Sequence, residues 1–226
     1  MKLYVNGDSH SAGAEAVNSY CFAEDDYTYR RLGRQPHPDN LAVSWGAKLA
    51  EMMNAELICD AESASSNERI IRTTNQYLHN HSDPEYIVIG WSTWEREEWW
   101  HEGRYWQVNA GGIGEDWPPE IVKRYKKWII SVDYQQKKRI AAEQIWDLHY
   151  KLFLRNIPHL FFNCYESLHV NHVPELSFGL DYIAPYDDNF TYYNWCRSQG
   201  FNTVNPKSYQ DRKSTRLNSS HTDISR

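Results

Sequence analysis

Apolar residues gather in short continuous runs along the chain, and each run ends in a polar loop. Four such runs occupy residues 3–6, 55–59, 86–90 and 157–164. Continuous apolar runs of this length are typical of parallel strands that are buried on both faces of a sheet. The pattern therefore predicts four strands, of which 86–90 (Tyr-Ile-Val-Ile-Gly) is the clearest.

Segments with helical spacing of apolar residues separate these runs. Asp39 or Asn40 can cap a first helix, whose predicted apolar face carries Leu41, Trp45, Leu49 and Met52. Ser65 or Ser66 can begin a second helix, in which Glu68 is placed for a capping box. The predicted apolar face of this second helix holds Ile70, Ile71 and Leu78.

Two later helices complete the alternation. A long helical stretch runs from about 120 to 156, and a short helix over 190–199 ends at Gly200. Strands that alternate with helices predict an α/β fold in three layers (αβα), with a mostly parallel sheet and right-handed crossovers. We expect a single domain over residues 1–210 that is incomplete at its C-terminus, because such a fold normally still needs a closing segment after Tyr209.

Residues 211–226 differ in composition from the rest of the chain. They contain no aromatic residue, and Ser, Thr, Asn and Arg dominate, which is typical of a disordered segment. The string Asp-Arg-Lys-Ser-Thr-Arg-Leu-Asn-Ser-Ser-His also resembles the translation of a common sequencing-library adapter. We therefore interpret this segment as a non-native tail and exclude it from the prediction of the fold.

Charge and cysteine usage narrow the classes of partner. The formal net charge of −6 argues against binding nucleic acid through a general electrostatic field. The basic run between Lys123 and Arg139 is a local exception, either the exposed face of the long helix or a nucleic-acid contact. The four cysteines are scattered without a Cys-x-x-Cys pair, as expected of reduced thiols. No apolar run is long enough to span a bilayer and no signal peptide is evident, so we expect a cytoplasmic protein without a membrane partner.

Candidate chemistry lies in the loops that follow the predicted strands. Gly7-Asp8-Ser9 comes directly after the first strand, 61–69 after the second, and Gly90-Trp91-Ser92-Thr93 after the third. The carboxyl ends of parallel strands meet at one edge of a sheet, so these loops should converge there. Ser9 can then project from a sharp turn as a nucleophile instead of packing inward.

These blocks resemble those of the SGNH, or GDSL-type, hydrolase family. Gly-Trp-Ser, with Arg96 and Glu98 after it, looks closer to phage or marine-virus members than to secreted lipases. Gly7-Asp8-Ser9 matches the first family block fully. Ala64 lies where the second block has Gly, and Ser92 stands where the third has Asn. The resemblance implies the flavodoxin-like fold of these enzymes, with Ser9 and Asp8 catalytic. It places oxyanion or substrate contacts at Gly7, Ala64, Asn67 and Ser92, with the N–H groups of Ser9 and Ala64 facing the oxyanion.

The late Asp-x-x-His block of the family is missing from this chain. The only late histidine is His221, inside the suspect tail. Without an imidazole, Ser9 has no general base to accept its proton. We therefore expect a truncated chain that is inactive or nearly so. His10 could serve as the base, although neighbours on a tight turn usually point apart, and it could instead form the rim of the site.

Three further patterns each allow two interpretations. His169-x-x-His172 with Glu175 could bind a metal, or could be solvated loop residues, which we prefer. The aromatic insert over residues 91–117 could stack sugar rings, or could pack as a lid or a subunit contact. Its acidic residues could be a carboxylate dyad or, as we prefer, could pair with basic neighbours as a solvated ion-pair surface. The residues concerned are Glu95, Glu97, Glu98, Arg96 and Arg104.

The leading hypothesis is an SGNH-type esterase that acts on an ester, possibly an O-acetyl group on a carbohydrate, through an acyl-enzyme at Ser9. It needs no cofactor and no metal. The alternative is a non-catalytic carbohydrate-binding or virion-associated module that has the same fold but no hydrolase activity. The oligomeric state stays open.

Overall fold

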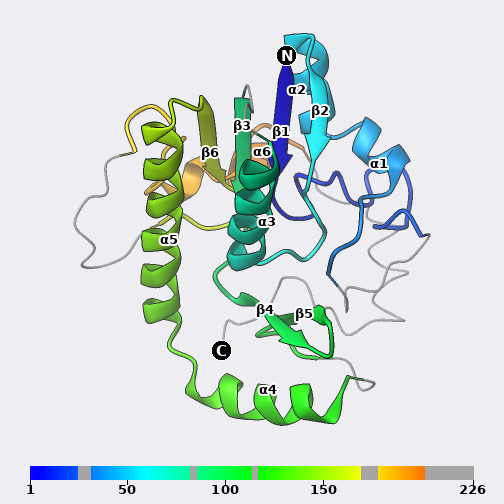
Figure 1. The fold of residues 1–226 in the computed structure, drawn as a ribbon, viewed down its shortest axis with the longest axis vertical. Coiled ribbons are helices and arrows are strands. Elements are labelled where there is room, and N and C mark those ends of the chain that lie inside the picture. The colour runs from blue at the N-terminus through cyan, green and yellow to red at the C-terminus, as the bar shows by residue number, and fades with distance from the viewer. Residues whose placement is uncertain (25–31, 82–85, 114–116, 169–177, 202–226) are drawn as a thin grey trace.

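A parallel sheet with the strand order β2-β1-β3-β6 forms the centre of the computed structural model (Figure 1). Its strands are β1 (Lys2–Asn6), β2 (Glu56–Cys59), β3 (Tyr86–Trp91) and β6 (His159–Asn163). The structure describes residues 1–24, 32–81, 86–113, 117–168 and 178–201. The four predicted strands are confirmed, because each predicted apolar run coincides with one of these strands to within one or two residues at each end.

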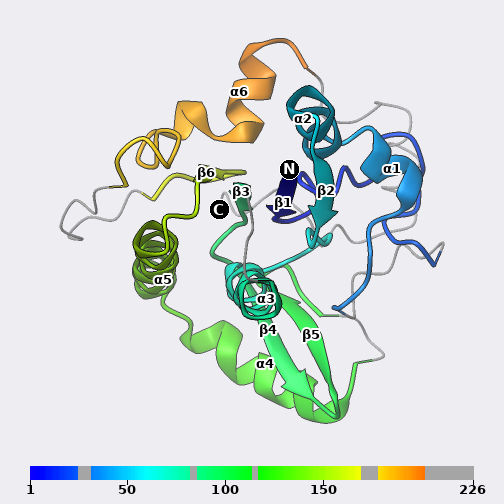
Figure 2. The same cartoon turned by 45° about the horizontal axis from the view of Figure 1, so that its top comes forward.

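Helices cover both faces of this sheet, which confirms the three-layer α/β prediction. Side chains alternate across the pleat, so Leu3 and Val5 point to one face and Tyr4 to the other. Helix α2 (Trp45–Met53) and α6 (Tyr192–Ser198) pack on the Leu3 face. Helices α3 (Asn67–Asn80) and α5 (Tyr134–Leu154) pack on the Tyr4 face (Figure 2).

The segment around Tyr182 extends the sheet beyond β6. Tyr182 forms an isolated parallel bridge with Phe161, and the backbone N–H of Phe161 donates to Asp181 O at 2.8 Å. The N–H of Ile183 donates back to Phe161 O at 2.9 Å. This edge was not among the predicted strands, because Asp-Tyr-Ile-Ala is too short to form an apolar run.

The first predicted helix is broken in two, so the prediction of one continuous helix was wrong. Helix α1 (Pro38–Ala42) ends before Ser44, whose hydroxyl caps α2 by accepting from the N–H of Ala47. Trp45 and Leu49 of the predicted apolar face do pack against the core, but Met53 packs there in place of Met52, which is 84% exposed. A serine that can satisfy free N–H groups competes with helix continuation.

The long predicted helix over 120–156 is also two helices, α4 (Pro119–Ser131) and α5. Asp133 begins α5, and its carboxylate accepts from the N–H of Gln136. In α3, the structure selects Ser66 as the N-cap, and its hydroxyl accepts from the N–H of Arg69. Glu68 therefore lies one position too early for the predicted capping box. The predicted helix over 190–199 is confirmed as α6, which Thr191 caps.

The aromatic insert forms a β-hairpin that the sequence pattern did not predict. Strands β4 (Arg96–His101) and β5 (Arg104–Asn109) pair antiparallel and lie with α4 beyond the carboxyl ends of the central strands (Figure 1). Five tryptophans of the insert are buried: Trp91, Trp94, Trp99, Trp106 and Trp117. Trp99, Trp106 and Trp117 form a separate apolar cluster with Ile121 of α4. Of the two interpretations of the insert, packing is therefore the one that the structure supports.

Two expectations concern residues that lie outside the described ranges. The tail 211–226 and the His169-x-x-His172 pair both lie there.

In the basic run, Lys123, Lys126 and Lys127 are exposed on α4, whereas Lys137 pairs with Glu97. Within the described ranges, no helix combines the length and apolar character needed to cross a membrane.

Candidate active site at the carboxyl edge of the sheet

Asp8 lies at the point where the loops after β1, β2 and β3 meet. Its side chain is completely buried, and its Oδ2 accepts hydrogen bonds from Arg96 Nη1 and from the Ser92 hydroxyl, both at 3.2 Å. Arg96 Nη1 also donates to Ser92 Oγ at 2.8 Å and to the carbonyl of Ser65 at 3.3 Å. One buried ion pair thus links the three loops.

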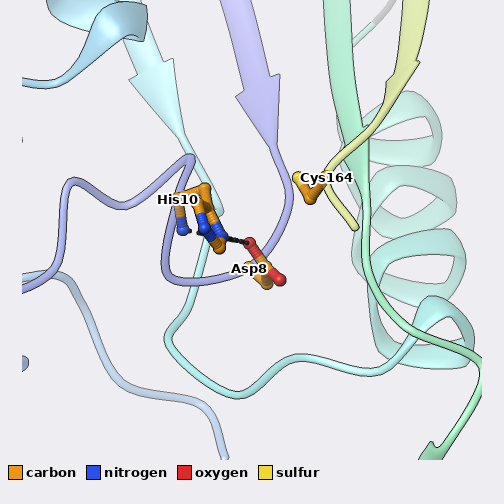
Figure 3. A group of neighbouring side chains, drawn as sticks. All are labelled: Asp8, His10 and Cys164. Carbon is orange, nitrogen blue, oxygen red and sulfur yellow. Dashed lines mark hydrogen bonds and ion pairs between the residues drawn. The ribbon is translucent and has the colours of Figure 1, made fainter. Parts of the chain in front are cut away.

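The other Asp8 oxygen binds His10. Asp8 Oδ1 accepts from the backbone N–H of His10 at 3.0 Å and lies 3.2 Å from His10 Nδ1 (Figure 3). Burial alone would raise the pKa of Asp8, but the charges of His10 and Arg96 and the hydrogen bonds from His10 hold that pKa well below its usual range. Asp8 is therefore an ionised carboxylate that fixes the position of an imidazole.

Ser9 is half-buried between this pair and the loop that follows β6. Its hydroxyl forms a hydrogen bond with the Tyr165 side chain. The His10 ring packs edge-on against Tyr165 and Tyr192, with ring centroids 4.5 and 5.6 Å apart. Burial, and then the charge of Asp8, raises the pKa of Tyr165, so its hydroxyl stays protonated. Ser9 and His10 thus occupy neighbouring positions on one turn, and both side chains contact Tyr165.

Asn67 and Ser92 form a closed pair of hydrogen bonds. The N–H of Ser92 donates to Asn67 Oδ1 at 2.8 Å, and Asn67 Nδ2 donates to the Ser92 carbonyl at 3.1 Å. The Ser92 hydroxyl proton is directed at Asp8, whereas the family resemblance implied a donor to the oxyanion. Both side chains therefore lie at the predicted edge, where they fix the loops to one another.

The turn before Ser9 depends on two glycines at a close approach. A Cβ on Gly7 would lie 2.2 Å from Ser11 Oγ, and a Cβ on Gly90 would lie 2.7 Å from Phe162 Cζ. Ser11 itself is completely buried between them. Gly7, predicted as a site residue, thus has a steric role that lets the first turn fold tightly against β3.

Ala64 adopts a backbone conformation that favours glycine. Its φ is +68°, in the left-handed region, and its side chain is buried. An alanine there carries a steric cost that glycine does not. The loop therefore keeps the backbone geometry of a glycine at the position that the resemblance aligned with the family Gly.

Replacing Ala64 with glycine should raise the free energy of unfolding by about 0.5–1 kcal/mol, because relief of the left-handed strain exceeds the added entropy of the unfolded chain. Chemical denaturation of both proteins measures the difference. Ala61→Gly in the same loop, where φ is not positive, should destabilise and serves as the matched control. Equal losses in the two variants would contradict the assignment of strain to Ala64.

Asp8, His10 and Cys164 place potential metal ligands within 4.8 Å of one another (Figure 3). Burial raises the pKa of the Cys164 thiol well above its usual value, and the Asp8 charge raises it further. The Asp8 carboxylate is already paired with Arg96. Both Asp8 oxygens are engaged by Arg96, Ser92 and His10, so a metal would have to replace these contacts, and we assign no metal to this group.

A second buried carboxylate supports the loop after β2. Glu62 is completely buried and lies 2.7 Å from Arg69 Nε, and it accepts from the N–H groups of Gly33 and Arg34 at 2.9 and 3.0 Å. Glu62 was not among the predicted site residues. Its position in the loop after an apolar strand, seven residues before Arg69, was the available signal.

Arg96 is the main site residue that the sequence analysis misplaced. The expectation of a solvated ion-pair surface was wrong for it, since Arg96 is 6% exposed and binds Asp8. Glu98 pairs instead with Arg72, through two contacts of 2.7 Å. Tyr165 was not predicted either, because nothing in the sequence distinguishes it among sixteen tyrosines.

Comparison with known proteins places the chain in a family. A family model described as "Family of unknown function (DUF6071)" matches residues 32–167, more than half of the chain. This protein is a member of DUF6071. The region of DUF6071 that matches contains Asn67, Ser92, Arg96 and Tyr165, whereas Asp8 and Ser9 precede it.

Among solved structures, the DUF6071 chain is similar to a mutant of the esterase AlinE4. The TM-score is 0.42 and the sequence identity 11%, over 94% of this chain and 91% of the other. No curated protein matches the chain.

Proposed function

We propose that this DUF6071 protein is an ester hydrolase of SGNH type, with Ser9 as the nucleophile. The observation that carries the proposal is the Asp8–His10 pair on the same turn as Ser9, at the carboxyl edge of a parallel sheet. A buried carboxylate that holds an imidazole nitrogen is the arrangement that lets the second nitrogen accept a proton. Ligands of parallel sheets bind at this edge.

In the proposed reaction, the Ser9 hydroxyl gives its proton to His10 Nε2 while Ser9 Oγ bonds to the ester carbonyl carbon. The N–H groups of Ser9 and Ala64 donate to the oxyanion that develops. Collapse of the tetrahedral intermediate breaks the bond to the alcohol, which takes the proton from His10. Water then hydrolyses the acyl-enzyme by the same route. Asp8 keeps Nδ1 of the imidazole protonated, and the Ser9–Tyr165 hydrogen bond must open first.

We expect slow turnover, because Ser92 supplies no hydrogen bond to the oxyanion. The Ser92 hydroxyl, which would take the place of the family amide, donates to Asp8. Loss of one oxyanion donor costs about 10²- to 10³-fold in rate. Small acyl esters, including O-acetyl groups on carbohydrates, are the proposed substrates.

A binding module without catalysis is the second candidate. It is favoured by the hydrogen bonds at this edge, which direct the Ser92 hydroxyl to Asp8 and tie Asn67 to the Ser92 backbone. The buried tryptophans of the hairpin give it little apolar surface for sugars, although Trp100 is 58% exposed.

A serine-directed fluorophosphonate probe tests the proposal. The hydrolase should be labelled at Ser9, located by peptide mass spectrometry, and Ser9→Ala should remove the label. Ser19→Ala, at an exposed serine of the following loop, is the matched control and should keep it. A folded protein that takes no label at Ser9 would overturn the hydrolase and favour the binding module.

A further inference from the structure

Two histidines and an aspartate meet at the opposite end of β6 from the Ser9 site. His149 lies on α5, His159 is the first residue of β6, and Asp181 lies in the segment that pairs with Phe161. One ligand atom from each lies within 4.8 Å of the other two. His149 Nδ1 is 2.8 Å from His159 Nε2, and Asp181 Oδ2 is 4.0 Å from both nitrogens.

The tautomer of His159 follows from its other contact. His159 Nδ1 lies 2.8 Å from the carbonyl oxygen of Ile157, which can only accept, so Nδ1 carries the proton. The lone pair of His159 Nε2 is therefore directed into the cluster. A backbone carbonyl that orients an imidazole through its second nitrogen is the usual support of a metal-binding histidine.

The cluster is buried on the side of the two histidines and open to solvent on the side of Asp181. Both imidazoles are buried, and the rings of Phe161 and Phe178 pack against His149, with centroids at 6.4 and 5.3 Å. The Asp181 side chain is 40% exposed and provides a route for an ion from solvent. Within the described ranges, the Asp181 carboxylate makes no hydrogen bond and has only the two imidazoles as ion-pair partners.

We infer that His149, His159 and Asp181 form a binding site for a divalent transition-metal ion of the zinc class. Two imidazole nitrogens and one carboxylate oxygen are ligands that Zn²⁺ accepts, with water at the fourth position, whereas Ca²⁺ and Mg²⁺ require more oxygen ligands. Zinc bonds of about 2.0–2.1 Å place tetrahedral ligands roughly 3.3–3.4 Å apart.

Small movements convert the observed cluster into that geometry. The two imidazole nitrogens, now 2.8 Å apart, would have to separate by roughly 0.6 Å to reach the spacing of tetrahedral ligands. The carboxylate oxygen, now 4.0 Å from each nitrogen, would have to approach by roughly the same amount. The proton on His149 Nδ1 would move to Nε2, so the imidazole binds as a neutral ligand. The alternative to a metal site is a simple hydrogen bond between the two histidines. That bond accounts for the contact between the imidazoles, but not for the position of the Asp181 carboxylate.

Titration of the full chain with Co²⁺, followed by visible absorption, tests the site directly, because four-coordinate Co²⁺ has a characteristic spectrum. We expect one Co²⁺ per chain, displaced by Zn²⁺. Asp181→Asn should weaken binding at least tenfold, while the protein stays folded because the residue is half-exposed. The control is Asp147→Asn, which removes an exposed carboxylate from α5, the helix that carries His149, and should leave Co²⁺ affinity unchanged. A thermal shift with Zn²⁺ should be present in the control variant and reduced in Asp181→Asn.

Two results would overturn the inference. One is the absence of a four-coordinate Co²⁺ spectrum in the unmodified protein. The other is equal affinity in Asp181→Asn, which would assign the bound ion to other histidines. His159→Gln provides an independent check through the same spectrum, and its result is interpreted only if circular dichroism shows an intact fold. Neither readout depends on ester hydrolysis, so the site stands or falls separately from the proposed function.

Discussion

Replacing Arg96 with methionine should lower the free energy of unfolding by about 3–5 kcal/mol. Methionine keeps much of the apolar stem but removes the guanidinium that lies 3.2 Å from the buried Asp8 carboxylate. Among the residues that the structure describes, the carboxylate then keeps His10 alone as a charged partner in a low-dielectric site. Two further hydrogen bonds, to Ser65 O and Ser92 Oγ, are lost as well. Urea denaturation followed by circular dichroism measures the change.

The control for this prediction is Arg104→Met in the same hairpin. Arg104 is exposed and stacks over Trp106, so its loss should cost much less than that of Arg96. Adding Asp8→Asn to Arg96→Met should recover part of the lost stability, because it removes the uncompensated charge. If the double variant were no more stable than Arg96→Met, the ion pair would not be the cause of the loss.

Replacing Ser9 with alanine should reduce the hydrolysis of p-nitrophenyl acetate to the level of the uncatalysed reaction. His10→Gln should lower kcat/KM by about 10²- to 10⁴-fold, the usual contribution of a positioned general base. Glutamine can keep a hydrogen bond to Asp8 but cannot accept the Ser9 proton. Steady-state rates of purified, folded variants provide the measurement.

His101→Gln is the matched control, since His101 lies on the hairpin strand β4 and makes no contact with Asp8 in the structure. It should retain the full rate. Loss of activity in Ser9→Ala with full activity in His10→Gln would keep the nucleophile and reject His10 as the base. Equal activity in Ser9→Ala and the unmodified protein would reject the nucleophile itself.

The central sheet was predictable because its strands are encoded locally. The buried strands form continuous apolar runs, as Ile87, Val88 and Ile89 of β3 illustrate. The edge strand β2 is also an apolar run, although it is only half-buried. The convergence of Asp8 and Ser92 follows from the parallel topology, since both residues come just after a strand. Sequence reasoning therefore located the edge of the sheet and most of the loops that meet there.

The hairpin was not predictable in the same way. Its turn consists of Glu102 and Gly103, with φ values of +48° and +81°, whereas Asn-Gly or Asp-Gly is the usual signal for such a turn. Its strands also bury polar residues such as Gln107 and Asn109, which conceals the alternation of a half-buried strand. Without the hairpin, no sequence pattern could place Arg96 beside Asp8.

The broken helices show a related limit. The apolar spacing continues across Ser44 and Asp133, and only the capping side chains mark the breaks. A serine or aspartate inside a helical pattern is compatible with either a cap or a solvated helix position. Tertiary packing decides between them, and the periodicity of one sequence does not contain that information.

The origin of Arg96 on the hairpin also bears on the order in which we expect the chain to assemble. Asp8 and Arg96 are separated by 88 positions, so the carboxylate leaves the ribosome long before its guanidinium partner. Strand β1 can pair with β2 early, but the turn that carries Ser9 cannot be fully desolvated until the hairpin docks. Contacts between such distant positions form late because closing the intervening chain costs entropy. We therefore expect the carboxyl edge of the sheet to become fully native only after the hairpin has docked.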